Sequence, residues 1–301
     1  MPVGPARRKG AWPSPSSRRA LLTAGAFLAV PLAGLLIFRV GTIAQAAANS
    51  LYQYDLLSGQ RVFTGAGNYL RAVHDAGFLQ SLSVTFQYAA MKIGVQIPLA
   101  LAIALLMQKS WRWASVVRTA VYLPVVTPFV VVATLWALMY NPTIGIIDAL
   151  LRKVHVAPLN FLIDPRLALP SLTAVTIWKD LGFTALIFLA GLQGIPQGYY
   201  EAAQVDGAGH WRQFWSVTLP LLKRFTLFSL VIATINAFQV YTPVYVMTQG
   251  GPLARTEVAT YYMYERAFLF YQMGYASALA IIVLLIILGL SAVYFRLLRP
   301  E

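Results

Sequence analysis

Long hydrophobic stretches separated by short polar segments dominate the pattern of the chain. Six of these stretches reach the roughly 18 to 20 residues that a helix needs to cross a bilayer. They are Leu21 to Phe38, Phe78 to Gln108, Thr119 to Ile147, Leu167 to Ile195, Phe225 to Thr248 and Tyr275 to Phe295. The pattern predicts an all-α membrane protein with six transmembrane helices, an even number that places both termini on the same side.

Only two of the stretches contain charged residues. Lys92 lies inside the second stretch, and Lys179 and Asp180 lie side by side in the fourth. Charges inside a membrane are costly and mark functional candidates unless they are paired. Because adjacent residues of a helix point about 100° apart, Lys179 and Asp180 are expected to face different neighbours. Lys92 either pairs within the bundle or contributes to a solute path, and both alternatives stay open.

Composition agrees with a membrane protein. The 301 residues are 58% hydrophobic and 11% charged, with a mean hydropathy of +0.65, whereas a soluble domain has about a quarter of its residues charged. The net charge of +13 would suit a nucleic-acid partner, but thirteen of the 23 basic residues fall on one side of the six-helix arrangement. This positive-inside bias accounts for the charge without nucleic acid and predicts that both termini are cytoplasmic.

The chain divides into a tail and a membrane domain. Residues 1–19 are basic and rich in proline and serine, and they are expected to form a disordered cytoplasmic tail. The first transmembrane helix is predicted at residues 20–43, and the other five at residues 69–296. A cleaved signal peptide stays open as an alternative for the start of the chain, although the first hydrophobic stretch exceeds the usual length of roughly 7 to 15 residues.

The inventory of reactive residues argues against an enzyme. The three histidines, His74, His155 and His210, fall in three different loops, and there is no cysteine, so neither a metal cluster nor an acid–base pair is indicated. The phosphate-binding pattern GxxxxGK followed by Ser or Thr is missing, as is the nucleophile pattern GxSxG. We therefore predict no catalytic residue, no metal and no cofactor in this chain.

A polar segment between the fourth and fifth stretches, Glu201 to Pro220, has the pattern of two short helices. Gly207 and Gly209 separate the two, and Leu219-Pro220 is expected to stop the second. The second of them carries three aromatic residues, Trp211, Phe214 and Trp215. On physical grounds alone, the segment is either an amphipathic element seated at the membrane interface or a surface that docks another protein.

The spacing of residues in this segment carries a family resemblance. Glu201-Ala202-Ala203, then Gly207, then Val217-Thr218-Leu219-Pro220 resembles the EAA loop of the membrane subunits of binding-protein-dependent ABC importers. The chain departs from the usual pattern at Val217, where isoleucine is more common. The resemblance implies that residues 197–221 form coupling helices that sit in a surface cleft of an ATP-binding subunit.

Each matched position has an implied role in that family. Glu201 would pair with a basic group of the ATPase, Ala202 and Ala203 would allow close approach, and Gly207 would form the bend. The ATPase-coupling residues implied by the resemblance are Glu201, Ala202, Ala203, Asp206, Gly207, Leu219 and Pro220. ATP and Mg would be bound by a dimer of partner ATPase subunits.

Two longer stretches narrow the resemblance. Trp178 to Ala208 and Val244 to Phe268, which includes the sequence TQGGP, are similar to carbohydrate-type permeases, specifically the first membrane subunit of maltose and glycerol-phosphate importers. The similarity covers about Tyr69 to Phe295. It implies a sugar importer in the bacterial cytoplasmic (inner) membrane. The implied partners are a second permease, an extracellular or periplasmic solute-binding protein and membrane lipid.

The same resemblance places sugar contacts in the fourth and fifth stretches. Amide groups suit sugar hydroxyls, and aromatic rings suit the C–H face of a sugar ring. The predicted substrate path consists of Trp178, Lys179, Gly182, Asn236, Gln239, Tyr241 and Tyr245. Pro243 is expected to loosen the helix there. Close helix packing stays open as an alternative for Gly182, and an interfacial position for Trp178.

Two other functions stay open on the sequence. The same type of importer could carry glycerophosphodiesters or another polar solute, since Lys92 and Lys179 would help to hold a phosphate. A stand-alone secondary carrier would need an ion-coupling site, for which the charged residues of the spans are candidates. The EAA-like segment argues against that carrier. The chain also lacks the large periplasmic insert of the maltose type, which leaves loops 44–77, 141–166 and 250–271 to contact a binding protein.

Overall fold

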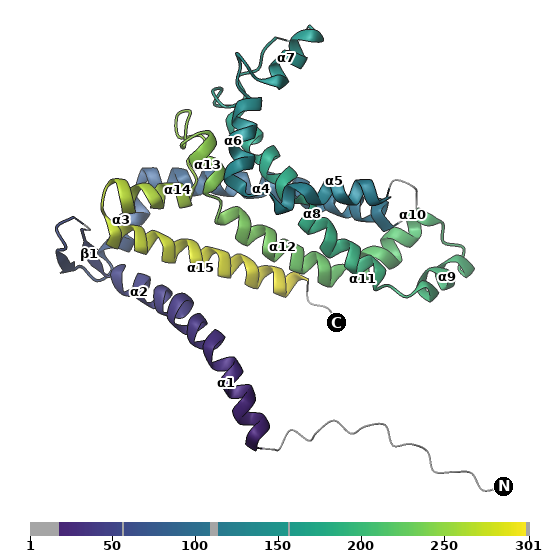
Figure 1. The fold of residues 1–301 in the computed structure, drawn as a ribbon, viewed down its shortest axis with the longest axis horizontal. Helices are drawn as coiled ribbons and strands as arrows, with labels where there is room; N and C mark the ends of the chain where they lie inside the picture. Colours follow the sequence, from purple (N-terminus) through teal and green to yellow (C-terminus); the bar gives the residue numbers. More distant parts are fainter. Residues whose placement is uncertain (1–17, 56, 109–113, 156, 299–301) are drawn as a thin grey trace.

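The computed structural model describes residues 18–55, 57–108, 114–155 and 157–298, and Figure 1 shows an elongated bundle of helices. Nearly all regular structure in these residues is helical, which confirms the all-α prediction. One β-hairpin is formed by β1 (Tyr52–Tyr54) and β2 (Arg61–Phe63), with Tyr52 opposite Phe63. It caps one end of the bundle (Figure 1).

Four long helical spans form the body of the bundle. They are α4 (Ala76–Gln108), α8 (Ala168–Gln193), α12 (Lys223–Phe238) followed by α13 (Thr242–Met247), and α15 (Met273–Leu297). Each is long and apolar enough to cross a membrane. Large apolar side chains from all four, among them Tyr88, Leu172, Phe238 and Leu279, are buried between them, which removes their surface from contact with lipid and fills the interior.

The first span starts with α1 (Arg18–Leu35), passes through a π-helical stretch, η1 (Leu36–Gly41), and ends with α2 (Thr42–Asn49). The helix thus runs past the predicted boundary at residue 43. α2 packs on α15, whereas α1 projects away from the bundle (Figure 1), and the most hydrophobic window of this span is 0% buried. Residues 1–17 of the predicted tail lie outside the described residues.

The predicted span Thr119 to Ile147 is not one helix. α5 (Ala114–Val126) and α6 (Phe129–Met139) meet at 103°. The cause is Pro128, which lacks an N–H and disfavours helical geometry at the residue before it. α5 packs along α8, whereas α6 packs on α13. The described residues therefore hold five helices able to cross a membrane, or six if this bent pair is counted as one span.

Short elements join the spans, and each end of the bundle has its own set of them. α3 (Gly67–His74) and α14 (Ala259–Tyr264) lie near the hairpin, and α9 (Gln197–Val205) and α10 (His210–Gln213) lie at the other end (Figure 1). The remaining short elements, in which η marks a π-helix, are α7 (Ile146–Lys153), η2 (Phe214–Thr218), α11 (Leu219–Leu221) and η3 (Glu265–Leu269).

Three polar contacts with one constant offset in sequence join α4 to α8. They run from Tyr88 Oη to Thr176 Oγ1 (2.9 Å), from Lys92 Nζ to Asp180 Oδ2 (2.6 Å) and from Gln96 Nε2 to Thr184 Oγ1 (2.7 Å). The partners are always 88 residues apart, so the helices run parallel and successive contacts lie about one turn apart on both. We call these contacts the polar ladder, and it sets the register of α4 against α8.

α5 approaches α8 closely at Gly182. A methyl group at this position would overlap the carbonyl oxygen of Val121 and lie 2.8 Å from Cγ2 of Val125. A side chain at 182 would therefore push the two helices apart. α8 thus contacts α4 through the polar ladder and α5 through a glycine.

Asp75 closes the end of the bundle near the hairpin. Its Oδ1 accepts hydrogen bonds from the N–H groups of Gly77 (3.0 Å) and Phe78 (3.3 Å), at the start of α4. Its Oδ2 accepts from the hydroxyls of Tyr262 (2.8 Å) and Tyr275 (2.6 Å). Burial opposes ionisation, but these hydrogen bonds outweigh it and lower the pKa of Asp75. One carboxylate therefore joins α4, α14 and α15.

Glu257, at the same end, titrates in the opposite direction. Burial and the neighbouring carboxyl group of Glu265 raise the pKa of Glu257 to about 7, against the opposing effect of the Arg266 charge. Arg266 itself lies over the rings of Tyr262 and Phe270, at 4.5 and 4.8 Å from their centroids. Near neutral pH, Glu257 is therefore partly protonated, unlike an ordinary glutamate.

Gly182→Ala should destabilise the protein by about 1–3 kcal/mol, because the added methyl forces α5 away from α8. Gly94→Ala is the matched control, since Gly94 lies in α4 with open space around it and alanine there should be neutral or slightly stabilising. The denaturation midpoint of each variant in detergent measures the effect. Equal midpoints for the two variants would contradict the close contact.

Hydrogen exchange should reveal the titration of Glu257. Its raised pKa means that the stabilising contribution is complete below the ordinary value of 4.5 and is lost as the pH rises through about 7. Amide protection of residues 255–270, corrected for the intrinsic pH dependence of exchange, should therefore fall between about pH 4.5 and about pH 7. Glu257→Gln should remove most of that fall. A fall of the same size in the variant would assign the effect to another group.

Candidate functional site

The segment Glu201 to Pro220 turns sharply at Gly207, where α9 ends. Gly207 has φ +74°. Its N–H donates to the carbonyl of Gln204 (2.9 Å), and the N–H of Ala208 donates to that of Ala203 (2.8 Å). This pair of bonds is the Schellman cap, which favours glycine at the left-handed position. The structure thus has the bend that the sequence predicts at Gly207.

The residues with the EAA-like spacing lie at the surface of this end of the bundle. Exposed members are Glu201, Ala202 and Asp206, and Ala203 is half-buried. On the bundle side of α9, the hydroxyls of Tyr200 and Thr218 are hydrogen-bonded at 3.0 Å. The segment is therefore folded back on itself, with its acidic residues outward.

Leu219-Pro220 does not stop the second helix, contrary to the sequence-based expectation. α10, η2 and α11 follow one another directly, and only Leu222 separates them from α12. A proline ring clashes with the carbonyl four residues earlier in an ordinary helix. Here the bond from Leu219 N–H to Phe214 O widens the preceding turn, which makes room for the ring. Helical structure thus joins the segment to α12.

Trp211, Phe214 and Trp215 form an aromatic cluster on this segment. Their ring centroids lie 5.5 to 6.0 Å apart, and Trp211 is 74% exposed. Exposed tryptophans suit both a membrane interface and a protein contact. The cluster and the acidic residues of α9 belong to the same end of the bundle (Figure 1).

A hollow of about 460 Å³ separates α9 and α10 from the end of α4. Its lining includes Gln108 of α4, Gln197 and Gln204 of α9, and Gln213 of α10. None of the residues of α9 is buried, and a segment with few buried apolar contacts has low local stability. α9 is therefore held less firmly to the bundle than the long helices are to each other.

A second polar region lies among α4, α8 and α12. Two hollows of about 260 and 190 Å³ share Asp180 and Asn236 in their linings. Lys92, Gln239 and Tyr241 line the larger of the two. Charged, amide and phenol groups thus converge between helices that are otherwise apolar, and we call the two hollows together the central hollow.

A break between α12 and α13 contributes backbone to the central hollow. Gln239 and Tyr241 leave the helical conformation, with φ −100° and −137°, shortly before Pro243 in the first turn of α13. Proline favours a helix start because it has no N–H to donate. The loosening that the sequence predicts at Pro243 is therefore present. Non-helical backbone is tolerated at membrane depth where it lines a cavity.

The charged residues of the spans have separate partners. Lys92 is 2% exposed and pairs with Asp180. Lys179 donates to the carbonyl of Val125 (2.9 Å) and lies 5.7 Å from the ring centroid of Phe129. Lys179 and Asp180 thus face different neighbours, as their adjacent positions predict. Since one lysine is neutralised by Asp180, the central hollow keeps one positive charge in excess.

The structure brings together four of the seven predicted path residues. The lining of the central hollow includes Lys179, Asn236, Gln239 and Tyr241. Trp178 lies outside it, is 43% exposed and contacts Trp136 edge-on at 5.6 Å. Tyr245 stacks on Tyr241 at 5.4 Å. Gly182 does not open α8 toward a ligand, because α5 covers it.

The sequence-based site did not include Asp180, Gln96 and Thr184, which also line the central hollow. Gln96 is buried, and its Oε1 has no hydrogen-bond partner among the described residues. A signal existed, since Lys92 and Gln96 on one helix and Asp180 and Thr184 on another are each four residues apart. Only the knowledge that α4 and α8 are neighbours turns that signal into a site.

An aromatic cluster extends from the central hollow toward the hairpin end. Its rings, with centroids 5.1 to 6.3 Å apart along the cluster, belong to Tyr241, Tyr245, Tyr261, Tyr264 and Phe268. Tyr245 and Phe268 are exposed. Rings of this kind offer flat apolar faces together with hydroxyl groups. We call this set the aromatic cluster of α13 and α14.

The described residues contain no cluster of three or more His, Asp or Glu side chains that could hold a metal ion. The central hollow instead presents amide, hydroxyl, ammonium and carboxylate groups. These groups include both charged and neutral hydrogen-bond donors and acceptors, so the arrangement is suited to the recognition of a polar solute.

Comparisons with known proteins agree with the geometry. Residues 96–299 match the family described as "Binding-protein-dependent transport system inner membrane component". The trehalose/maltose transport system permease protein MalF of Thermococcus litoralis is 34% identical over 79% of this chain and 80% of its own length. The sn-glycerol-3-phosphate transport system permease protein UgpA of Agrobacterium fabrum is 32% identical over 86% of this chain and 89% of its own.

A solved structure shares the fold. In the crystal structure of a bacterial alginate ABC transporter with its alginate-bound periplasmic protein, one chain superposes with a TM-score of 0.81 at 22% identity, covering 94% of this chain and 95% of that one. The family match includes α8, the segment Glu201 to Pro220 and the break before α13. The resemblance seen in the sequence is thereby confirmed. The chain belongs to the family of binding-protein-dependent inner membrane components and is a permease subunit of an ABC transporter, not an enzyme.

Proposed function

We propose that this permease forms one half of the translocation path of an ATP-driven importer for a sugar or a related polar solute. A second permease subunit completes the path, a dimer of ATPase subunits binds ATP and Mg, and a solute-binding protein delivers the cargo from outside. Both termini and the segment Glu201 to Pro220 lie on the cytoplasmic side of a bacterial inner membrane. The concentration of basic residues there supports this orientation.

The central hollow is the observation that carries the proposal. Asn236, Gln239 and Asp180 supply donors and acceptors for hydroxyl groups, and Tyr241 begins the aromatic cluster. Transporters commonly build their substrate sites from broken helices near the middle of the membrane, and the break between α12 and α13 is of this kind. The name of the relative MalF, a trehalose/maltose permease, supports a sugar as cargo.

The coupling segment is proposed to transmit ATPase closure to this hollow. Glu201 would pair with a basic group of the ATPase, with Ala202 and Ala203 allowing close approach at the exposed surface of α9. Asp206 and Gly207 end α9, and Leu219 and Pro220 lead through α11 toward α12. Since α12 carries Asn236, a displacement of the segment would alter the central hollow and switch its access between the two sides.

α1 is proposed to contact the second permease or lipid. Large apolar side chains such as Phe27 and Val30 are each 79% exposed, and α1 projects from the bundle (Figure 1). An apolar helix surface of this size needs a partner of low polarity. Lipid covers it in an isolated subunit, and a second permease would cover part of it in the assembled importer.

An anionic solute such as a glycerophosphodiester is the second candidate cargo. The observation in its favour is Lys179, whose positive charge has a backbone carbonyl as its hydrogen-bond partner rather than a carboxylate. A phosphate or sulfonate in the central hollow would neutralise that charge. The relative UgpA, a glycerol-3-phosphate permease by name, supports the same alternative.

Glu201→Ala should weaken attachment of the ATPase subunits roughly tenfold or more, because a basic group of the partner would lose its counter-charge. Gln204→Ala is the matched control, being an exposed change on the same helix outside the EAA-like spacing. Co-purification of the ATPase and solute uptake measure the effect, and membrane insertion should be unaffected. Unchanged uptake and complex yield in Glu201→Ala would count against this role.

Asp180→Asn should abolish uptake and lower stability by about 3–5 kcal/mol, since it leaves Lys92 buried without a counter-charge. The double variant Lys92→Met/Asp180→Leu separates the two effects, because replacing a buried pair by apolar residues of similar size often restores stability. We expect it to regain its denaturation midpoint but not its uptake. Recovery of both would show that the pair is structural and contributes nothing to solute recognition.

A further inference from the structure

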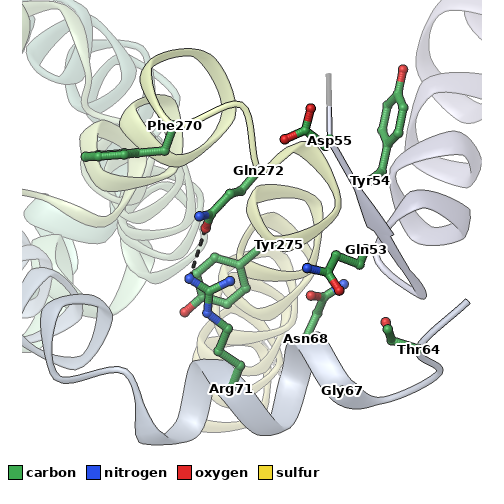
Figure 2. Close-up of a pocket in the computed structure, with 10 residues that line it drawn as sticks. All are labelled: Gln53, Tyr54, Asp55, Thr64, Gly67, Asn68, Arg71, Phe270, Gln272 and Tyr275. Carbon is green, nitrogen blue, oxygen red and sulfur yellow. Dashed lines mark hydrogen bonds between the residues drawn. The ribbon is translucent and has the colours of Figure 1, made fainter. Parts of the chain in front are cut away.

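A separate polar cavity of about 410 Å³ lies at the hairpin end of the bundle, at the opposite end from the coupling segment. Figure 2 shows the side chains of Gln53 and Asn68 facing those of Arg71 and Gln272 across it. The hairpin, α3 and the start of α15 supply its walls. Its lining shares no residue with the central hollow.

The walls of this cavity are held in place by specific contacts. Asn68 Nδ2 donates to the carbonyls of Ser50 (2.8 Å) and Tyr52 (2.9 Å), which fixes the hairpin to α3. A methyl group at Gly274 would overlap the carbonyl oxygen of Tyr52, so the hairpin also packs tightly on α15. The cavity is therefore a built feature of the fold rather than a gap between loose loops.

Arg71 forms one wall with its guanidinium plane. Its Cζ lies over the ring of Tyr275, 4.0 Å from the centroid, and Nη2 donates to Gln272 Oε1 (2.9 Å; Figure 2). Because these contacts hold the guanidinium on one side, its other N–H groups remain available to a ligand. The side-chain N–H₂ of Gln272 is available in the same way.

The opposite side supplies acceptors and an uncommitted amide. Gln53 makes no side-chain hydrogen bond to the described residues, so both its amide groups are available. Asp55 uses Oδ1 for the N–H groups of Leu57 and Ser58, both at 2.9 Å, which leaves Oδ2 for a ligand. Asn68 likewise keeps its Oδ1, since both of its side-chain hydrogen bonds to the described residues use Nδ2.

The charges of the cavity balance. The N–H of Ser58 lowers the pKa of Asp55, so its carboxylate is ionised at neutral pH and offsets the guanidinium of Arg71. The lining thus offers donors and acceptors in similar number with no net charge. Phe270 stands at the rim, with its ring directed away from the polar side chains (Figure 2) and the Arg266 guanidinium over it at 4.8 Å.

We propose that this cavity binds one neutral sugar unit. A sugar hydroxyl donates and accepts at once, which matches a lining that offers both hydrogen-bond donors and acceptors. The volume falls within the roughly 300–1,000 Å³ typical of small-ligand pockets. An anionic sugar would meet the carboxylate of Asp55. The proposal rests on the proposed function in one respect, the orientation in the membrane. In the proposed orientation the cavity faces outward, where it can hold cargo near the entrance of the translocation path.

The test uses the assembled importer in lipid nanodiscs without its binding protein. Saturation-transfer NMR with D-glucose as the probe measures binding of the neutral sugar unit. Gln53→Ala removes a lining amide without breaking a hydrogen bond among the described residues and should raise the dissociation constant about tenfold. Gln60→Ala, an exposed change on the same hairpin outside the cavity, should leave it unchanged.

A second variant tests the charge balance. Asp55→Asn leaves the guanidinium of Arg71 without its counter-charge, so D-glucuronate should gain affinity relative to D-glucose by about tenfold. If wild type and Asp55→Asn prefer glucose over glucuronate by the same factor, Asp55 does not contact the ligand and that part of the proposal is overturned. A local fold defect would instead weaken both probes, and hydrogen exchange of residues 50–75 identifies it.

Other outcomes overturn the proposal outright. Equal glucose binding in Gln53→Ala and Gln60→Ala would show that the cavity takes no sugar. If Gln53→Ala leaves glucose binding unchanged and, in a separate assay with the binding protein added, weakens attachment of that protein, the cavity is a protein contact. The double variant Lys92→Met/Asp180→Leu separates this proposal from the central hollow. Loss of all glucose binding in it would show that the sugar lies in the central hollow alone. Intact Gln53-dependent binding would instead support a cavity that is independent of the path.

Discussion

The ion pair between Lys92 and Asp180 is the interaction on which the arrangement of the bundle depends. Lys92 is buried between α4 and α8, and its Nζ lies 2.6 Å from Asp180 Oδ2. An unpaired charge there would be strongly destabilising, whereas the pair tolerates burial. A shift of one helix along the other by a single turn, about 5.4 Å, would separate the pair together with the other two contacts of the polar ladder. Electrostatics therefore sets the register that apolar packing alone leaves loose.

The other helices are placed by that register. With α8 held against α4, Gly182 faces α5 and lets the two backbones come close, and α12 covers the remaining side where Asn236 and Asp180 share a hollow. The apolar stretch that contains α5 and α6 cannot run straight past this core, because Pro128 turns it by 103° onto α13. The central hollow is the space that these constraints leave.

The two ends of the bundle differ in stiffness, and this difference suits transport. At the hairpin end, Asp75 ties α4, α14 and α15 together through hydrogen bonds of 2.6 to 3.3 Å. At the other end, α9 rests over a polar hollow, yet helical structure joins its segment to α12. In the coupling proposed above, a force applied at α9 would pass to α12, which lines the central hollow, while the opposite end stays held.

The sequence by itself determined the membrane class, most of the spans and the bend at Gly207, because these follow from hydrophobicity and the conformational freedom of glycine. It also determined the family, through the spacing from Glu201 to Pro220. Only the tertiary structure decided that Lys92 meets Asp180, that Gly182 serves packing and Trp178 lies outside the hollow, and that the helix continues through Pro220. Each of these depends on which helices are neighbours and in what register. Lys92 and Asp180 are 88 residues apart in sequence, so their contact becomes visible only once the chain is folded.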